Sequence, residues 1–334
     1  MWSTVLPWLP ASIREMLSPL PEQVTARAEE IRIREGRPLE VGYGGGDYTF
    51  VAPRGETTRN PAAAYRATRD DCRRLLDRIT NHSLYTMEEE LRRGYITVSC
   101  GHRIGLAGQA LLEQGAVRGL KHISGFNVRI ARQVIGVSEA LLPQLWNDEL
   151  GTLHHTLIVS PPQRGKTTLL RDVARAVSCG GWVNDNAAVR SRKVGIVDER
   201  SEIAACLDGA PSFDVGPRTD VLDGCPKAEG MMMMIRALSP DVLVVDELGR
   251  TEDTGAVLEA LHAGISVVAT AHGRGVDDAR LRPTLRPLFD AHVFRRIVVL
   301  AASGPLGGAS VFDGQGAPLP PVFRHTGAAP PGRR

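Results

Sequence analysis

Residues 157–172, with the sequence LIVSPPQRGKTTLLRD, constrain the fold of this chain more than any other stretch. An apolar pattern typical of a buried strand ends at Ser160, a short loop follows, and an amphipathic helix pattern begins near Lys166. A phosphate-binding loop needs this order of strand, loop and helix, because its backbone N–H groups and the helix N-terminus must face the phosphates. The stretch therefore predicts a nucleotide-binding α/β sheet.

The loop departs from the usual pattern G-x-x-x-x-G-K-[ST] at its first position, where this chain has Ser160. We expect the serine and the two prolines after it to shape the turn, while Gly165 lets the backbone approach a phosphate closely. Lys166 would hold the β and γ phosphates of ATP, Thr167 would ligate Mg²⁺, and Thr168 would contact the α phosphate. The predicted ATP-binding residues are Ser160, Pro161, Pro162, Gln163, Arg164, Gly165, Lys166, Thr167 and Thr168.

The basic residues of the chain support a special role for Lys166. Only four of the 40 Lys and Arg residues are lysines, and the other 36 are arginines. A cation that served solubility alone would therefore usually be an arginine here. Lysine is the compact point charge that a phosphate-binding loop uses.

A second apolar strand pattern, DVLVVDELGR, ends in Asp246 and Glu247. Parallel strands bring their carboxyl ends to one edge of a sheet, so both carboxylates would lie beside the loop. We expect Asp246 to bind Mg²⁺ and Glu247 to polarise the attacking water in phosphoryl transfer.

Two further strand patterns end in polar side chains. KVGIVDERSEIA places Asp198 and Glu199 at a strand end, and both are candidate catalytic acids. AGISVVATAHGRG ends in Thr270 and His272, and His272 is a candidate sensor of the γ phosphate.

The pattern of expected strands and helices changes once along the sequence, near residue 140. Before it, alternating β-like runs surround a helix pattern over residues 69–84, which predicts a smaller α+β domain over residues 1–140. After it, apolar strands alternate with amphipathic helices, which predicts a mainly parallel sheet with both faces covered over residues 141–318. The Pro/Gly-rich stretch 319–334 is expected to be a disordered tail. The methionines at 231–234 are expected to belong to a helix core.

Composition excludes several classes of protein. The chain has 334 residues, 43% of them hydrophobic, and we find no apolar run of the roughly 18 residues that a membrane helix needs. Its five cysteines are scattered without a C-x-x-C pair, which supports neither a disulfide framework nor a zinc site. A net charge of +2 and 5% aromatic residues give no strong indication of a nucleic-acid partner. These features predict a cytosolic protein whose contact with a membrane is peripheral.

The order of these motifs resembles the secretion-type ATPases of type II and type IV systems, with their Walker A, Asp box, Walker B and His box. In the Asp box, the usual I-E-D-P is V-D-E-R here, so the two acids, Asp198 and Glu199, stand in exchanged order. In the Walker B motif, the usual G-E-x-R is D-E-L-G-R here, so Glu247 matches the glutamate, and Arg250 matches the arginine with a shift of one residue.

A closer resemblance covers nearly the whole chain. Stretches from EEIRIREGRPLEV to ATAHG, above all RTDVLDGCPKAEGMMMMIRALSPDVLVVDELG, resemble the stage III sporulation protein AA family. The resemblance implies an α/β fold in which a smaller N-terminal α+β domain precedes a RecA-like P-loop NTPase core. It also implies ATP hydrolysis with Mg²⁺, a hexameric ring, and a position on the mother-cell side of a membrane. The expected partners are membrane proteins of the channel complex between mother cell and forespore.

A ring would bring an arginine from a neighbouring subunit to the γ phosphate. The candidate trans arginines are Arg103, Arg129, Arg132 and Arg218. Three alternative functions stay open at this point: a nucleic-acid-dependent P-loop ATPase, a non-catalytic nucleotide-binding scaffold, and a small-molecule kinase for which no acceptor site can be identified.

Overall fold

The computed structural model divides into two compact units. The N-terminal unit comprises residues 1–132 with 205–208, and the C-terminal unit comprises residues 133–204 with 209–334. The contacts thus separate the units between Arg132 and Gln133, whereas the pattern of expected strands and helices changes near residue 140. The predicted domain limits stay a prediction. The residues that the structure describes are 2–80, 94–113, 115–162, 164–184, 187–300 and 308–320.

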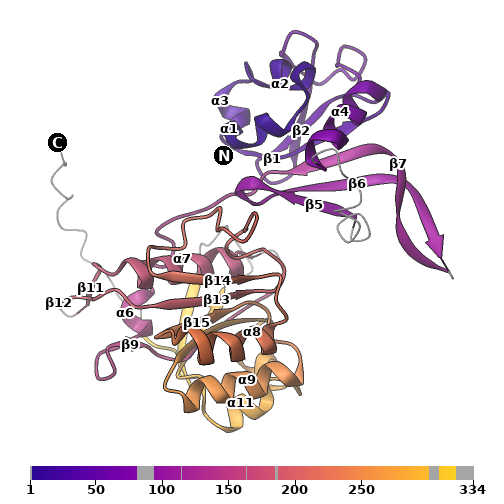
Figure 1. Ribbon diagram of the computed structural model, residues 1–334. Helices are drawn as coiled ribbons and strands as arrows, with labels where there is room; N and C mark the ends of the chain where they lie inside the picture. The colour runs from indigo at the N-terminus through magenta and orange to yellow at the C-terminus, as the bar shows by residue number, and fades with distance from the viewer. Residues whose placement is uncertain are drawn as a thin grey trace. The chain divides into compact units, whose positions relative to one another are not determined.

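The N-terminal unit is built on an antiparallel sheet with the strand order β4-β3-β2-β1-β7-β6-β5. The central strand β1 (Ala28–Arg34) alternates buried and more exposed positions, as expected for a sheet with one covered face. Strands β6 (His102–Glu113) and β7 (Ala116–Arg129) are long enough to form a projecting hairpin (Figure 1). The other strands are β2 (Glu40–Tyr43), β3 (Asp47–Val51), β4 (Thr57–Thr58) and β5 (Tyr95–Val98).

Helix α4 (Arg69–Ile79) covers the sheet beside β7. Thr68 caps it: the Thr68 hydroxyl accepts a hydrogen bond from the backbone N–H of Asp71, and the Asp71 carboxylate accepts one from the backbone N–H of Thr68. The predicted helix began at the same residue, and its end at residues 81–84 lies outside the described residues. The remaining helices are α1 (Trp2–Val5), η1 (Leu6–Trp8), α2 (Ala11–Leu17), α3 (Glu22–Thr25) and η3 (Ser99–Gly101).

The C-terminal unit is built on a sheet with the strand order β14-β13-β15-β16-β10-β17-β18. Every neighbouring pair from β14 to β17 is parallel, so the carboxyl ends of these strands share one edge. The edge strand β18 is antiparallel to β17, which the sequence patterns did not predict. The strands are β10 (Thr156–Ser160), β13 (Val194–Asp198), β14 (Thr219–Asp223), β15 (Val242–Val245), β16 (Ser266–His272), β17 (Arg296–Leu300) and β18 (Ala309–Asp313).

Helices lie on both faces of this sheet, as predicted. Helix α7 lies on one face, and α8, α9 and α11 lie on the other (Figure 1). Met231 and Met234 are buried in the core under the second face, which confirms the helix-core prediction for those two methionines. The principal helices are α7 (Lys166–Cys179), α8 (Lys227–Met233), the π-helix η4 (Met234–Leu238), α9 (Thr251–His262), α10 (Val276–Arg280) and α11 (Arg286–Asp290).

Short elements complete the C-terminal unit. They are α6 (Leu142–Leu145), β8 (Trp146–Asn147), β9 (Thr152–Leu153), β11 (Val183–Asn184) and β12 (Ala187–Ala188). Within the described ranges, no helix combines the length and the apolar character that crossing a bilayer requires. Cys72, Cys100, Cys179, Cys206 and Cys225 form no disulfide bond with one another. Residues 321–334 of the predicted tail lie outside the described residues.

Candidate nucleotide site

Strand β10 and helix α7 hold the predicted phosphate-binding loop between them. The strand ends at Ser160, and the helix begins at Lys166 directly after Gly165. Gly165 has a φ of 86°, which a residue without a Cβ adopts without strain. The predicted context of strand, loop and helix is therefore confirmed, with Gln163 outside the described residues.

The serine at the loop start causes no backbone conflict. Ser160 is absent from the described residues with positive φ, so its position does not require a glycine. Its side chain is buried, and its hydroxyl donates a hydrogen bond of 2.8 Å to the backbone oxygen of Pro161. The hydroxyl thus closes the first turn of the loop internally, a solution that the motif pattern alone did not reveal.

The ammonium group of Lys166 lies inside the loop. Its Nζ donates to the backbone oxygens of Ser160 at 3.3 Å and Pro161 at 3.4 Å, and to Nδ1 of His272 at 3.1 Å. Lys166 is 6% exposed, and this burial lowers the pKa of the ammonium, against the opposing effect of Asp246 and Glu247. Across the described residues it forms no ion pair with a carboxylate, so a buried cation is left for an anionic ligand.

The hydroxyl of Thr167 and the carboxylate of Asp246 form an oxygen pair at the mouth of the loop. Thr167 Oγ1 donates to Asp246 Oδ2 at 2.8 Å. The other carboxylate oxygen, Oδ1, accepts from the backbone N–H of Glu247 at 3.0 Å and from the Thr270 hydroxyl. Hydroxyl and carboxylate oxygens are the ligands that Mg²⁺ prefers, so the donor set fits that ion.

Both oxygens of the Glu247 carboxylate are engaged. Oε1 lies 2.9 Å from Nε2 of His272, and Oε2 accepts from Nη1 of Arg200 at 2.9 Å. Because Lys166 can only donate to Nδ1 of His272, the imidazole proton belongs on Nε2 and points at Glu247. Glu247 also has a φ of 50°, a left-handed conformation that costs a residue with a side chain about 1 to 3 kcal/mol.

The structure gives the two acids after β13 different surroundings. The buried carboxylate of Asp198 accepts hydrogen bonds of 2.8 to 2.9 Å from the backbone N–H groups of Glu202, Ile203 and Ala204. Burial raises the pKa of Asp198, against the opposing effect of these hydrogen bonds. Glu199 is instead partly exposed and accepts from Nζ of Lys227. Asp198 therefore shapes the loop over residues 199–204, whereas the Glu199 carboxylate pairs with the side chains of Lys227 and Arg250.

A buried arginine of α7 holds the same loop from the other side. Arg171 Nε donates to the backbone oxygen of Ile203, and Nη2 donates to that of Glu202 at 2.7 Å. Its guanidinium lies 4.2 Å from the ring centre of Phe213, and burial lowers its pKa to about 10. Arg171 was not among the residues predicted from the sequence; the available signal was a charged side chain within the apolar pattern of the helix.

Three of the four candidate trans arginines belong to the N-terminal unit. Arg132 donates to the backbone oxygens of Ala26 and Ala28, and Arg103 lies over a tyrosine ring in the same N-terminal unit. Arg129 also belongs to that unit, in strand β7. Arg218 donates to the Ser191 backbone and lies just before β14, at the amino edge of the sheet. The role of these four arginines in trans stays a prediction.

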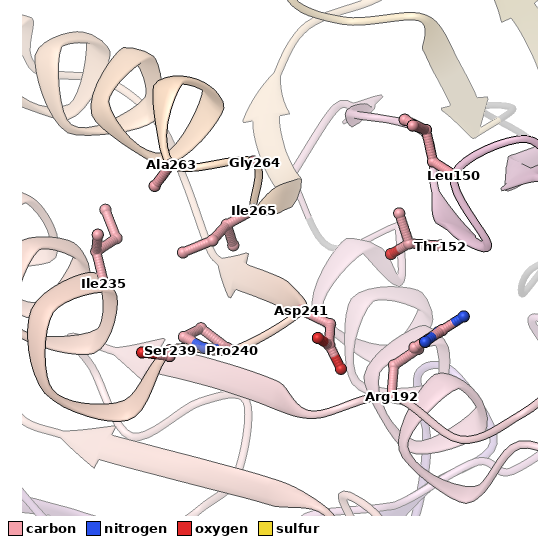
Figure 2. Close-up of a pocket in the computed structure, with 10 residues that line it drawn as sticks. All are labelled: Leu150, Thr152, Arg192, Ile235, Ser239, Pro240, Asp241, Ala263, Gly264 and Ile265. Atoms are coloured by element: carbon pink, nitrogen blue, oxygen red, sulfur yellow. The ribbon is translucent and has the colours of Figure 1, made fainter.

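A cavity of about 350 Å³ lies at the amino edge of the same sheet, opposite the edge that carries the loop (Figure 2). Arg192, Asp241 and Ile265 line it, and they directly or closely precede β13, β15 and β16. The parallel strands therefore separate this cavity from Lys166, which follows the carboxyl end of β10. The cavity is not part of the nucleotide site.

The comparison with protein families covers the chain from residue 3 to residue 319, which match the family described as sporulation stage III, protein AA. The chain belongs to that family. Stage III sporulation protein AA of Bacillus subtilis (strain 168) is 48% identical over 309 residues, covering 92% of this chain and 94% of the relative. The resemblance inferred from the sequence is thus confirmed.

Two solved structures share the fold. The pilus retraction motor PilT with bound ADP aligns over 90% of this chain and 82% of its own, with a TM-score of 0.56 and 16% identity. The ATPase DotB of Legionella pneumophila aligns over 81% of this chain and 72% of its own, with a TM-score of 0.50 and 18% identity. At such identities the likeness concerns the fold, and it confirms the predicted RecA-like P-loop architecture.

Proposed function

We propose that this chain is a Mg²⁺-dependent ATPase that works as a hexameric secretion-type motor at a membrane complex of sporulation. The observation that carries the proposal is the convergence at one sheet edge of Lys166, the Thr167–Asp246 oxygen pair, and the Glu247–His272 pair. The ring and the membrane partners rest on membership of the family and on the fold shared with the motor PilT and the ATPase DotB.

The residues of the site would divide the work of phosphoryl transfer. Lys166 exchanges its contacts with backbone oxygens for contacts with the β and γ phosphates, which stabilises charge that builds up on them. Glu247 accepts a hydrogen bond and then a proton from the attacking water, and His272 orients that carboxylate through Nε2. Mg²⁺ bound to Thr167 Oγ1 and Asp246 would neutralise phosphate charge. Glu199 lines a small cavity together with Asp246 and Glu247, where it would face the attacking water.

ATP hydrolysis by the full chain tests the proposal. Turnover is measured with and without Mg²⁺ over a wide range of protein concentration, and light scattering gives the mass in the same samples. Specific activity that rises as a hexamer appears supports a motor with shared sites. Activity that is flat in a monomer contradicts the ring, and no turnover contradicts the ATPase.

The matched variant is Glu247→Gln, which keeps the size of the side chain and removes the base. It should bind ADP as the native chain does and lose turnover by about 10²-fold or more. An unchanged hydrolysis rate would remove Glu247 from the catalytic role. Stimulation of the native chain by DNA or RNA would favour the nucleic-acid-dependent alternative.

A further inference from the structure

Arg200 is the residue that connects the loop after β13 with the proposed catalytic base. Its Nη1 donates to Glu247 Oε2 at 2.9 Å, while His272 occupies Oε1. A carboxylate whose two oxygens are both held in this way becomes a stronger base toward water when the cation on one of them moves away. The guanidinium of Arg200 is the partner on the more exposed side, because the Arg200 side chain is 61% exposed.

The main chain that carries Arg200 is fixed more firmly than the side chain. Asp198 holds the N–H groups of residues 202–204, and Arg171 holds the carbonyl groups of residues 202 and 203. Ser201 donates from its hydroxyl to Asp223 at 2.7 Å. The loop therefore presents Arg200 from a set position, and rotation of the exposed side chain is enough to move the guanidinium.

The charges around Glu247 show what Arg200 would meet when ATP binds. A chain of contacts connects Lys166 through His272 and Glu247 to Arg200. A phosphate held by Lys166 therefore brings negative charge close to the Glu247 carboxylate, which repels it. The nearby cations Lys227 and Arg250 both pair with Glu199, whereas Arg200 pairs with Glu247 itself, which places Arg200 to stabilise both charges.

We propose that Arg200 is a catalytic residue that acts within its own subunit: its guanidinium leaves Glu247 Oε2 and binds the γ-phosphoryl group when ATP occupies the site. This inference rests on the proposed ATPase function. The water oxygen then forms a bond to the γ phosphorus, and the bond from phosphorus to the β–γ bridging oxygen breaks. The electron pair leaves with ADP, and the released Oε2 of Glu247 takes the water proton.

The test compares Arg200→Ala with Arg236→Ala, a change at an exposed arginine of η4 in the same unit. Arg200→Ala should lower kcat by about 10² to 10³-fold, because it removes a donor to the transferring group. Its affinity for ADP should stay within about twofold, while its affinity for ADP with aluminium fluoride, which imitates the transition state, should fall. Arg236→Ala should behave as the native chain in all three measurements.

Two results would overturn the role of Arg200. A higher kcat in Arg200→Ala would mean that the contact only restrains Glu247, and an unchanged kcat would make it a surface ion pair. Arg200→Lys keeps the charge but loses the planar fork, so it should recover part of kcat at most. If the native chain shows no Mg²⁺-dependent turnover, both the proposed ATPase function and the role of Arg200 fail. If the native chain turns over ATP and Arg200→Ala gives either result above, only the role of Arg200 fails.

A mixing experiment separates action within a subunit from action across a ring. Arg200→Ala subunits keep Glu247, and Glu247→Gln subunits keep Arg200. If Arg200 acts within its own subunit, mixing the two variants restores no activity. Recovered turnover in the mixture would show that Arg200 serves a neighbour, and it would overturn the proposal.

Discussion

The two units of this chain bury polar side chains in different ways. In the N-terminal unit, Asp71 and His102 are buried, and their partners belong to the fold itself. Asp71 accepts from the Ser12, Tyr65 and Thr68 side chains and from the Thr68 backbone. His102 accepts from the Ala131 N–H at Nδ1, so Nε2 donates to the Thr4 hydroxyl.

In the C-terminal unit, the buried Lys166 has partners that a ligand can replace. Its contacts with two backbone oxygens are long. Its third partner, His272, also contacts the carboxylate of Glu247, which accepts a further hydrogen bond from Arg200. The difference teaches how to separate structural from functional polar groups. Short contacts with several fixed backbone or hydroxyl partners indicate a role in stability, whereas long contacts around a single buried charge indicate a binding role.

The largest expected effect is on nucleotide binding. Lys166→Ala should abolish measurable ADP binding, because the phosphates lose their buried cation, while the free energy of unfolding changes by no more than about 1 kcal/mol. Calorimetric titration with ADP and urea unfolding of the same samples measure both quantities. Loss of the folded state would break the comparison, since Lys166 would then be a structural group.

Asp198 lies in the C-terminal unit but has the partner set of a structural group. Asp198→Ala leaves the buried N–H groups of Ile203 and Ala204 and the partly buried one of Glu202 without an acceptor, and should lower the free energy of unfolding by about 3 to 4 kcal/mol. Glu199→Gln, the matched change at the neighbouring acid, should cost about 1 kcal/mol or less. Urea unfolding of both variants checks this, and equal losses would contradict the distinction.

Asp71 provides the corresponding test in the N-terminal unit. Asp71→Ala removes the α4 capping box and the acceptor for Ser12 and Tyr65, and should lower the free energy of unfolding by about 2 to 3 kcal/mol. ADP affinity, measured below the unfolding transition, should stay within about twofold of the native value. A large change in ADP affinity would show that this unit takes part in binding.

The smallest expected effect is a pH dependence from His102. Burial lowers the pKa of His102 to about 4, below the roughly 6.5 of an unfolded histidine. Between these values the unfolded chain binds a proton that the folded chain does not, so stability falls as the pH drops from about 6.5 to 4. From pH 7 to pH 5 the loss from His102 should be about 1 to 2 kcal/mol.

Urea unfolding of the native chain and of His102→Gln at the two pH values measures that loss. His154 also has a pKa of about 4, lowered by burial first and then by Arg296, so the C-terminal unit adds a loss of the same sign. His102→Gln should therefore remove only part of the acid sensitivity. The same acid loss in the variant and in the native chain would exclude His102 as a source.

The sequence was sufficient to predict the parallel sheet and the loop of the C-terminal unit, because both depend on local patterns. Apolar strands, a glycine before a lysine, and acids at strand ends mark the sheet edge where Lys166 and Glu247 lie. The same patterns predicted Asp198 and Glu199 as candidate catalytic acids without distinguishing them, because the two residues are adjacent at one strand end. Only the path of the loop after β13 determines that the three N–H groups point at Asp198.

Other features depend on contacts that are distant in the sequence. Arg200 lies 47 residues from Glu247, and Arg171 lies more than 30 residues from the carbonyl groups that it holds. An arginine-rich chain gives no local signal for Arg200, and the only signal for Arg171 is its place within the apolar pattern of α7. The antiparallel strand β18 was not predicted for a related reason. Its pairing with β17 depends on the chain reversing its direction after β17, which no local pattern marked.

The unequal use of lysine and arginine has a consequence for chemical labelling. Lys166 and Lys227 are buried, whereas Lys121 and Lys193 are exposed. Reagents that acylate primary amines should therefore modify very few positions on this protein at neutral pH. Amine-directed crosslinkers and acetylation would leave most of its surface unmarked, and guanidinium-directed reagents are the better choice for mapping its neighbours.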